Sequence, residues 1–549
     1  MPNNPKGKEV LDRFKLARSE RSNFDSQYQD LKDLIRPDGG NFNRTQSQGK
    51  RNYSIIYDGT AINANEEFSS GLHAYLTSPT ERWLELGVPA IKNIQDYPEA
   101  LQWLDDVADQ IYAVYSNPNS NFNPTLHETY MDLGAFGTGV VFQEWDPDNQ
   151  SIIFKSGILG ECYFQENNNG FVDSIYQYKE WTGKELCQEF CRDTDTFEGT
   201  DLWKQATLPE NAFKRYRLIR AIFPRKDRMY GKLDAGNKAY ASYYVAESTM
   251  DVLRVSGYDS FPAAVTRWVK ISGETYGRGP GSKCLPDITS LQTMEKTLLK
   301  AGQKAVDPPL IIPDEGFMEP ISTAPGSIIY KETGAEEIKS LDFKGNLNFG
   351  VEQCNQKRIY IKQCFHEDWF KRFRKNREQS ATEVLDDRDE MLRFLAPMLG
   401  RQQTELLGPL IKRTYMLLNE HGMIPPAPDI LKKRKLEIIY ISPAARAQQG
   451  VKADRMSRFI QDMIPLMQAD PTVMDAVNKD NMVQIYATTR GVPRAILNSL
   501  KQIEAIRASR AQQQQAAQVA QTAEPASKSV LNLAQAQAAT GGGSPGGPL

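Results

Sequence analysis

The chain has 549 residues, of which 40% are hydrophobic and 25% charged, and its formal net charge is −3 at pH 7. These proportions are ordinary for a globular protein and exclude a largely disordered chain. Proteins that hold nucleic acid tightly usually have a strongly basic domain, so the near-neutral balance predicts that any contact with DNA is local or weak.

No apolar run approaches the roughly 18 residues that a membrane helix needs, and the first residues lack the apolar stretch of a signal peptide. We therefore expect a soluble protein that is made inside the cell and has no membrane partner. Six cysteines are too few for a disulfide framework. Cys187 and Cys191 could share a helix face, but two packed thiols are favoured over a zinc site, because no second pair or nearby histidine accompanies them.

The first half of the chain is predicted to mix helix and sheet. Apolar residues recur at helical spacing over 1–36, 61–76, 98–116 and 125–136, and Pro37–Gly40 ends the first of these helices. Shorter, strand-like runs follow, rich in β-branched and aromatic residues and broken by glycine or proline. They are Val140–Trp145, Ser151–Lys155, Leu218–Phe223, Tyr240–Val245 and Ala263–Val269. The expected fold class is α+β.

Two long helices with a compact insert between them come next. The first is predicted over 285–306, with Pro286 near its start, where proline is tolerated, and a length of about 33 Å. The insert, 307–345, is rich in proline and glycine, and the second helix is predicted over 347–370.

The remaining sequence is predicted to be helical up to a low-complexity end. Ser380 and Glu383 form a capping box that opens a helix running to about Glu420, with kinks near Pro397 and Pro409. Residues 446–508 have helical spacing again. Beyond 510 the chain is rich in Gln, Ala and Gly, which predicts a tail that is mobile or helical only in a complex.

Motifs for catalysis were weighed and rejected. The glycine-rich run Gly277–Lys283 resembles a phosphate loop, but Ser282 stands where the Walker pattern requires glycine, so a turn before the long helix is favoured. His366-Glu367 opens like a zinc-protease helix, but Phe370 replaces the second ligand. We therefore expect no catalytic residue, no metal and no cofactor, and the chain is not predicted to be an enzyme.

Charge is segregated across the two helices and their insert. The insert 307–345 carries eight acidic residues against three lysines, whereas 357–377 carries eight basic residues against Glu367 and Asp368. Within 371–377 the basic residues alternate with aromatic residues, a pattern that could bind an anionic partner. The alternative is that this segment is only a solvated helix end. Its basic residues are Lys371, Arg372, Arg374, Lys375 and Arg377.

Six short motifs, in this order and spacing, resemble the portal proteins, or head-to-tail connectors, of short-tailed bacteriophages over roughly 8–510. They are FSSGL at Phe68–Leu72, WLEL at Trp83–Leu86, GETYGRGP at Gly273–Pro280, SATEV at Ser380–Val384, GMIPP at Gly422–Pro426 and YISP at Tyr440–Pro443.

The resemblance implies a ring of twelve subunits at one capsid vertex, each with a mixed α/β wing, a two-helix stem, a small α/β clip and a helical crown. The implied segments are the wing at 1–280 and 381–440, the stem at 281–306 and 346–370, the clip at 307–345, a channel loop at 371–380, the crown at 441–508 and a low-complexity tail or barrel at 509–549.

The same resemblance implies a conduit for double-stranded DNA during packaging and ejection, assembled in the host cytoplasm and retained in the virion. The implied partners are the terminase large subunit, a tail adaptor, and the major capsid and scaffolding proteins. We predict that the five basic residues of the channel loop touch DNA phosphates without reading bases, and that Asp314, Glu315 and Glu319 of the clip help to dock partners. A merely solvated clip loop, a capsid-interior scaffold, and a packaging ATPase or nuclease are the alternatives.

Overall fold

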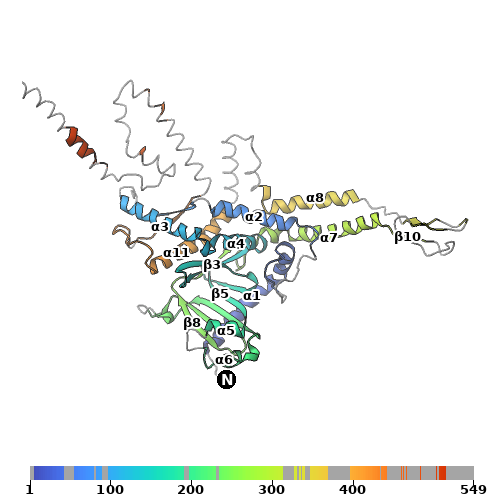
Figure 1. Cartoon of the computed structure of the whole chain (residues 1–549), viewed down its shortest axis with the longest axis horizontal. Coiled ribbons are helices and arrows are strands. Elements are labelled where there is room, and N and C mark those ends of the chain that lie inside the picture. Colours follow the sequence, from blue (N-terminus) through green and yellow to red (C-terminus); the bar gives the residue numbers. More distant parts are fainter. Residues whose placement is uncertain are drawn as a thin grey trace, which may run out of the picture. The chain divides into compact units, whose positions relative to one another are not determined.

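The computed structural model describes most of the first 441 residues and short parts of the remainder (Figure 1). The described residues are 5–42, 55–79, 82–89, 97–190, 197–229, 234–312, 327–330, 333–334, 337–340, 347–368, 396–432, 434–441, 459, 461–462, 465, 482–483, 503 and 506–514. The chain divides into two compact units. The first comprises Met1–Gly87, Asp106–Pro426 and Glu437–Ala444, and the second comprises Val88–Asp105, Ala427–Leu436 and Ala445–Leu549.

A five-stranded antiparallel sheet in the order β4-β5-β6-β7-β8 lies in the first unit (Figure 1). Helix α1 packs on one face of this sheet, and α5 and α6 pack on the other. Both faces are therefore buried, which explains why the strands are apolar and aromatic with little alternation. The elements are α1 (Pro5–Ile35), β4 (Cys162–Glu166), β5 (Val172–Thr182), α5 (Gly183–Phe190), α6 (Asp201–Ala206), β6 (Arg215–Pro224), β7 (Tyr240–Ala246) and β8 (Val252–Tyr258).

The apolar side of α1 explains its position on the sheet. Val10, Leu11 and Phe14 recur at helical spacing and are buried in one cluster with residues of β5, β6 and β7. Two turns beyond Phe14, Arg21 is fully buried, and its guanidinium donates to the carbonyl oxygens of Leu159, Gly160 and Cys162 at 2.8–2.9 Å. The sequence prediction of a helix over 1–36 is confirmed.

A second, three-stranded sheet in the order β3-β2-β9 lies beside α4, and α2 packs on α4. Phe68 and Leu72 of α2 and Leu126 and Leu133 of α4 are fully buried. Helix α4 ends at Gly137, whose φ of 79° is the left-handed conformation that glycine adopts at low cost. The elements are α2 (Thr60–Leu76), α4 (Phe122–Phe136), β2 (Thr138–Asp146), β3 (Ser151–Ser156) and β9 (Ala263–Arg267).

Distant parts of the chain meet in a two-stranded antiparallel sheet. Strand β1 (Leu84–Gly87) pairs with β12 (Glu437–Tyr440), with Leu84 opposite Tyr440. Helix α3 (Pro98–Ser116) begins in the second unit and continues into the first.

The predicted α+β class is confirmed, and three predicted helices need correction. The helix expected from 285 begins earlier, as α7 (Pro280–Val306), because Pro280 occupies the first helical position, where a missing N–H costs nothing. The helix expected over 347–370 is interrupted after α8 (Leu347–Cys364), since His366 adopts a φ of 58°.

The long helix predicted to end near Glu420 contains a π-helical turn at Gln403–Leu407, before α11 (Gly408–Glu420). This irregularity lies next to Pro409, where the sequence predicted a kink. The predicted capping box at Ser380 and Glu383, and most of the helical segment predicted over 446–508, lie outside the described residues.

Candidate functional site: the α7–α8 hairpin and its attachment

Helices α7 and α8 lie side by side and form what we call the α7–α8 hairpin (Figure 1). Ile288 and Leu291 of α7 and Cys354 and Ile361 of α8 are buried. A short two-stranded ribbon, β10 (Leu310–Ile311) with β11 (Lys339–Ser340), lies in the insert between the helices.

The glycine-rich run that resembled a phosphate loop has a packing role. A Cβ at Gly279 would lie 2.6 Å from the carbonyl oxygen of Leu133, and one at Gly281 would lie 2.6 Å from that of Ala135. Only glycine lets the start of α7 approach the end of α4 this closely. Gly277–Gly279 lead into α7, as expected, with Arg278 bridged to Val269, whereas residues 280–283 already belong to its first turn.

Ion pairs join α8 to α7 and to the segment before α2. Lys357 pairs with Asp287, and Arg358 pairs with Glu295 and, at 2.8 Å, with Asp58. Burial acts to raise the pKa of Asp58, but hydrogen bonds from Thr60 and Arg358 outweigh it and hold that pKa below its usual value. The attachment therefore favours ionised Asp58 at neutral pH.

Gln292 makes a second attachment of α7. Its side-chain oxygen accepts from the backbone N–H groups of Tyr57 and Asp58 at 2.7 and 3.0 Å, and its amide nitrogen donates to the Asp58 carbonyl at 2.6 Å. Because Gln292 is buried, these three bonds fix the rotation of α7 about its axis.

The outer face of α7 is cationic. Lys296, Lys300 and Lys304 are exposed and four residues apart, so they lie on one side of the helix. The acidic residues of α7, Asp287 and Glu295, are instead paired with α8. This outer face therefore favours an anionic partner.

The far half of the hairpin exposes many large apolar side chains. Val306 is 89% exposed, and the set includes Leu299, Phe349 and Val351 of the two helices and Leu310, Ile311 and Ile312 of the adjoining insert. Apolar surface gathered in this way marks an interaction face, because isolated soluble proteins seldom leave it in water.

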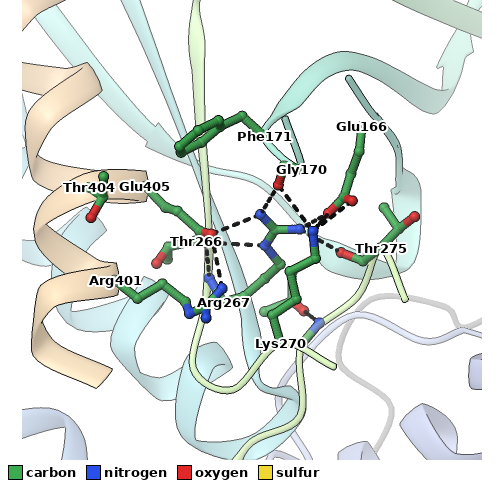
Figure 2. Close-up of polar contacts among 12 residues, drawn as sticks. Glu166, Gly170, Phe171, Thr266, Arg267, Lys270, Thr275, Arg401, Thr404 and Glu405 are labelled. Carbon is green, nitrogen blue, oxygen red and sulfur yellow. Dashed lines mark hydrogen bonds and ion pairs between the residues drawn. The ribbon is translucent and has the colours of Figure 1, made fainter. Parts of the chain in front are cut away.

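A buried ion network attaches the π-helical turn to the body of the first unit (Figure 2). We call Arg267, Glu405, Glu166 and Lys270 the Arg267 network. Arg267 of β9 is fully buried; its backbone N–H, Nε and Nη2 donate to the Glu405 carboxylate at 3.0, 3.1 and 2.8 Å. Its Nη1 donates to Glu166, and Nη2 also donates to the Gly170 carbonyl at 2.9 Å.

Neighbouring bonds complete this attachment. Lys270 donates to Glu166 at 2.7 Å, and Gln402 exchanges bonds with β9, accepting from the Thr266 hydroxyl at 2.5 Å and donating to the Arg267 carbonyl at 3.0 Å. The Tyr440 hydroxyl donates to the carbonyl oxygen of Gln403 at 3.0 Å, so a π-turn carbonyl has a partner from β12. The π turn is thus held from two strands.

The residues that the sequence singled out lie largely elsewhere. The predicted DNA-contacting residues Lys371, Arg372, Arg374, Lys375 and Arg377 and the predicted clip residues Asp314, Glu315 and Glu319 all lie outside the described residues. Three further basic residues of segment 357–377 are described, and all pair with acids, so they add less free positive charge than the count suggested. They are Lys357, Arg358 and Lys362.

Sequence reasoning missed the Arg267 network. Its two carboxylates, Glu166 and Glu405, lie more than 100 residues from Arg267 in the chain, so only the fold brings them together. No group of three or more His, Cys, Asp or Glu within the described ranges could hold a metal ion. Among the helices of those ranges, none is both long and apolar enough to span a membrane.

A mixed α/β body that carries a long helical hairpin with exposed apolar and cationic faces is the architecture of an assembly component. Residues 7–497 match the family of bacteriophage head to tail connecting proteins. The chain is 29% identical over 495 residues to the probable portal protein of Bordetella phage BPP-1, covering 88% of this chain and 87% of that protein. It is 28% identical over 508 residues to the portal protein of Salmonella phage epsilon15, covering 90% and 89% respectively.

The chain belongs to the bacteriophage head to tail connecting proteins, the portal family that its motifs predicted. Proteins of this family are structural parts of the virion at the junction of head and tail, and their general role is to provide the conduit through which DNA is packaged.

Proposed function

We propose that twelve copies of this chain form a ring at one capsid vertex and that the α7–α8 hairpins form the wall of its DNA channel. The observation that carries this proposal is the exposed apolar surface of the hairpin's far half, which a neighbouring copy would cover. In this assignment 281–306 and 346–370 are the stem and 307–345 the clip. The wing is 1–280 with 381–440, the channel loop 371–380, the crown 441–508 and the tail 509–549.

The dimensions of the helices support twelve copies. With 27 residues, α7 is about 40 Å long. Twelve helices about 10 Å apart form a ring with a circumference near 120 Å and a radius near 19 Å. When about 5 Å is subtracted from this radius for the helix and its side chains, the remaining bore is roughly 28 Å wide. Duplex DNA about 20 Å wide passes through such a bore with a layer of water, whereas nine helices leave only about 18 Å.

The channel must conduct DNA without holding it. Twelve copies of the five basic residues Lys371, Arg372, Arg374, Lys375 and Arg377 supply about 60 charges, but a 10 Å belt of duplex presents only about six phosphates. Contacts of this kind can be exchanged as DNA moves, and they carry no sequence information. If neutralising all five leaves DNA packaging, retention and ejection unchanged, this assignment is wrong.

The clip is the proposed docking surface for the terminase large subunit and later for a tail adaptor, with Asp314, Glu315 and Glu319 orienting basic partner surfaces. Reversing these three charges is expected to weaken docking, and more so at low salt. Docking that is unaltered at several salt concentrations would count against this role. The major capsid and scaffolding proteins are further partners during assembly in the host cytoplasm, and no catalytic activity is assigned to the chain.

Electron microscopy of the purified protein tests the central proposal. Rings of about twelve subunits with a central hole are the expected result. Variants Leu299→Lys and Val351→Lys should impair ring formation, whereas Lys204→Glu, at an exposed position of α6, should not. Filled or irregular particles would favour the scaffold alternative, and turnover of ATP would favour a packaging motor.

A further inference from the structure

The α7–α8 hairpin is a pair of helices with two broad faces and, on each helix, an outer face that points away from the other helix (Figure 1). Helical geometry assigns side chains to these surfaces. Residues seven apart share one side of a helix, whereas residues two apart point about 200° away from each other. The contacts between the two helices, and their contacts with Asp58, supply the reference directions.

The first broad face binds Asp58 near the base of the hairpin, through Gln292 of α7 and Arg358 of α8. Leu299 follows Gln292 by seven residues, and Val351 precedes Arg358 by seven, so both continue this face along the hairpin. Their side chains are exposed beyond the part that the body covers. The exposed apolar residues of this face are Leu299, Val306 and Val351.

The second broad face, on the opposite side, also exposes large apolar side chains. Tyr360 comes two residues after Arg358, and Phe349 comes two residues before Val351, so both point to the other side of α8. Tyr360 is 43% exposed and Phe349 is 64% exposed. A single two-fold contact cannot cover two opposite faces. A closed ring can, because each copy then presents a different surface to each of its two neighbours.

The outer face of α7 is cationic. Leu298 marks the side of α7 that meets α8, since a Cβ at Gly350 would lie 2.7 Å from the Leu298 Cδ2 atom. Lys300 comes two residues after Leu298 and therefore points away from α8. Lys296 and Lys304 lie four residues to either side of Lys300 and share its side of the helix.

The threonines of this outer face do not offer their hydroxyl protons to a ligand. The hydroxyls of Thr289, Thr293 and Thr297 donate to carbonyl oxygens one turn earlier in α7, at 2.8–3.0 Å. The lysines are therefore the principal donors of the surface. An ammonium group on a flexible stem attracts phosphates as a point charge and does not require one fixed geometry.

The outer face of α8 has a different chemistry. Lys357 turns toward α7 to pair with Asp287, so Ile359, two residues later, points away and is 57% exposed. Glu352 follows Gly350 by two residues and lies exposed on the same side. A carboxylate repels a polyanion, and an apolar side chain gains nothing from one. Of the two outer faces, that of α7 therefore suits a bore that contains DNA.

We propose that α7 is the inner helix of the ring and α8 the outer helix, with the two broad faces of each hairpin packed against the hairpins of two neighbouring copies. Lys296, Lys300 and Lys304 then face the bore and contact DNA phosphates. This inference rests on the proposed function, because the bore exists only in the ring. Twelve copies place about 36 ammonium groups along about 12 Å of α7, where a duplex presents only about seven phosphates, so contacts can be exchanged as DNA moves.

Photo-crosslinking tests which helix is the inner one. Full-length Lys300→p-benzoylphenylalanine is co-assembled with wild-type copies into particles that have packaged DNA, and the particles are irradiated. Glu352→p-benzoylphenylalanine is the matched control, since it is exposed on the outer face of α8 at nearly the same height along the hairpin. We expect protein bound covalently to DNA from position 300 and only the unirradiated background from position 352. Equal yields, a higher yield at 352, or no crosslink at 300 in particles that hold DNA would overturn the order of the helices.

Cysteine crosslinking tests the packing of the broad faces. The double variant Phe349→Cys with Val351→Cys is assembled, treated with a short bifunctional maleimide and run on a denaturing gel. We expect a ladder of covalent multimers, because position 351 of one copy lies against position 349 of the next, and the wild type and each single variant should remain monomeric. Dimers from a single variant would show a two-fold contact and overturn the packing. Rings with the opposite crosslinks would refute this inference alone, whereas a protein that forms no rings would refute the proposed assembly.

Discussion

Replacing Glu405 by glutamine should loosen the π-helical turn from β9. Glu405 is buried and accepts three hydrogen bonds from Arg267, at 2.8–3.1 Å. Glutamine keeps a similar volume but loses the charge and turns one acceptor into a donor that faces the guanidinium. Removing one partner of a buried ion pair costs about 3–5 kcal/mol, since the other charge stays in the interior. Glu166 still neutralises part of Arg267, so the lower end is expected.

Hydrogen exchange measured by mass spectrometry is the appropriate assay, because a multi-unit chain has no single unfolding free energy. A loss of about 3 kcal/mol corresponds to exchange about two orders of magnitude faster in the amides of α11 and β9. Amides of β6 and β7, which lie in the other sheet, should be unchanged.

Arg401→Gln is the matched control. Arg401 contacts the same carboxylate at 3.4 Å but is about one third exposed, so its loss should cost no more than about 1 kcal/mol. The reasoning is refuted if Glu405→Gln accelerates exchange no more than Arg401→Gln does.

Three further predictions concern the same body. Burial raises the pKa of Asp132 to about 6, so the folded state binds a proton more tightly than the unfolded state. The free energy of unfolding should therefore rise as the pH falls from about 6 towards 4. Asp132→Asn should flatten this part of a profile of denaturation against pH. Gly279→Ala should lower the thermal midpoint, because its methyl group would overlap the Leu133 carbonyl, whereas Gly302→Ala, in open space on α7, should not. Tyr440→Phe should cost about 1 kcal/mol in local exchange of the π turn, and a null effect would show that water replaces the hydroxyl.

Elements that depend on local pattern were predicted well from the sequence. The helix over 1–36 and the strand at Tyr240–Val245 follow from the spacing of side chains that each bury one face or both. The helix ends near 280 and 364 were predicted less well. The start of α7 depends on close approach to α4, and the end of α8 depends on a left-handed His366, which the spacing of apolar residues does not encode.

The candidate site shows the same division. The two long helices and their insert were visible in the sequence, as was the family, because six motifs kept their order and spacing. The Arg267 network was not visible, since Arg267 meets Glu166 and Glu405 from positions 101 and 138 residues away in the chain.

Taken alone, the sequence determined the class of protein, the hairpin and the segregation of its charges. The near-neutral total of −3 nevertheless concealed which charges are free. Only the tertiary structure decided that Lys357 and Arg358 form ion pairs with acidic side chains. It also decided that Lys296, Lys300 and Lys304 are exposed to solvent. The physical reason is that spacing along a helix determines which residues share a face, but the face that meets another element is selected by packing over long chain distances.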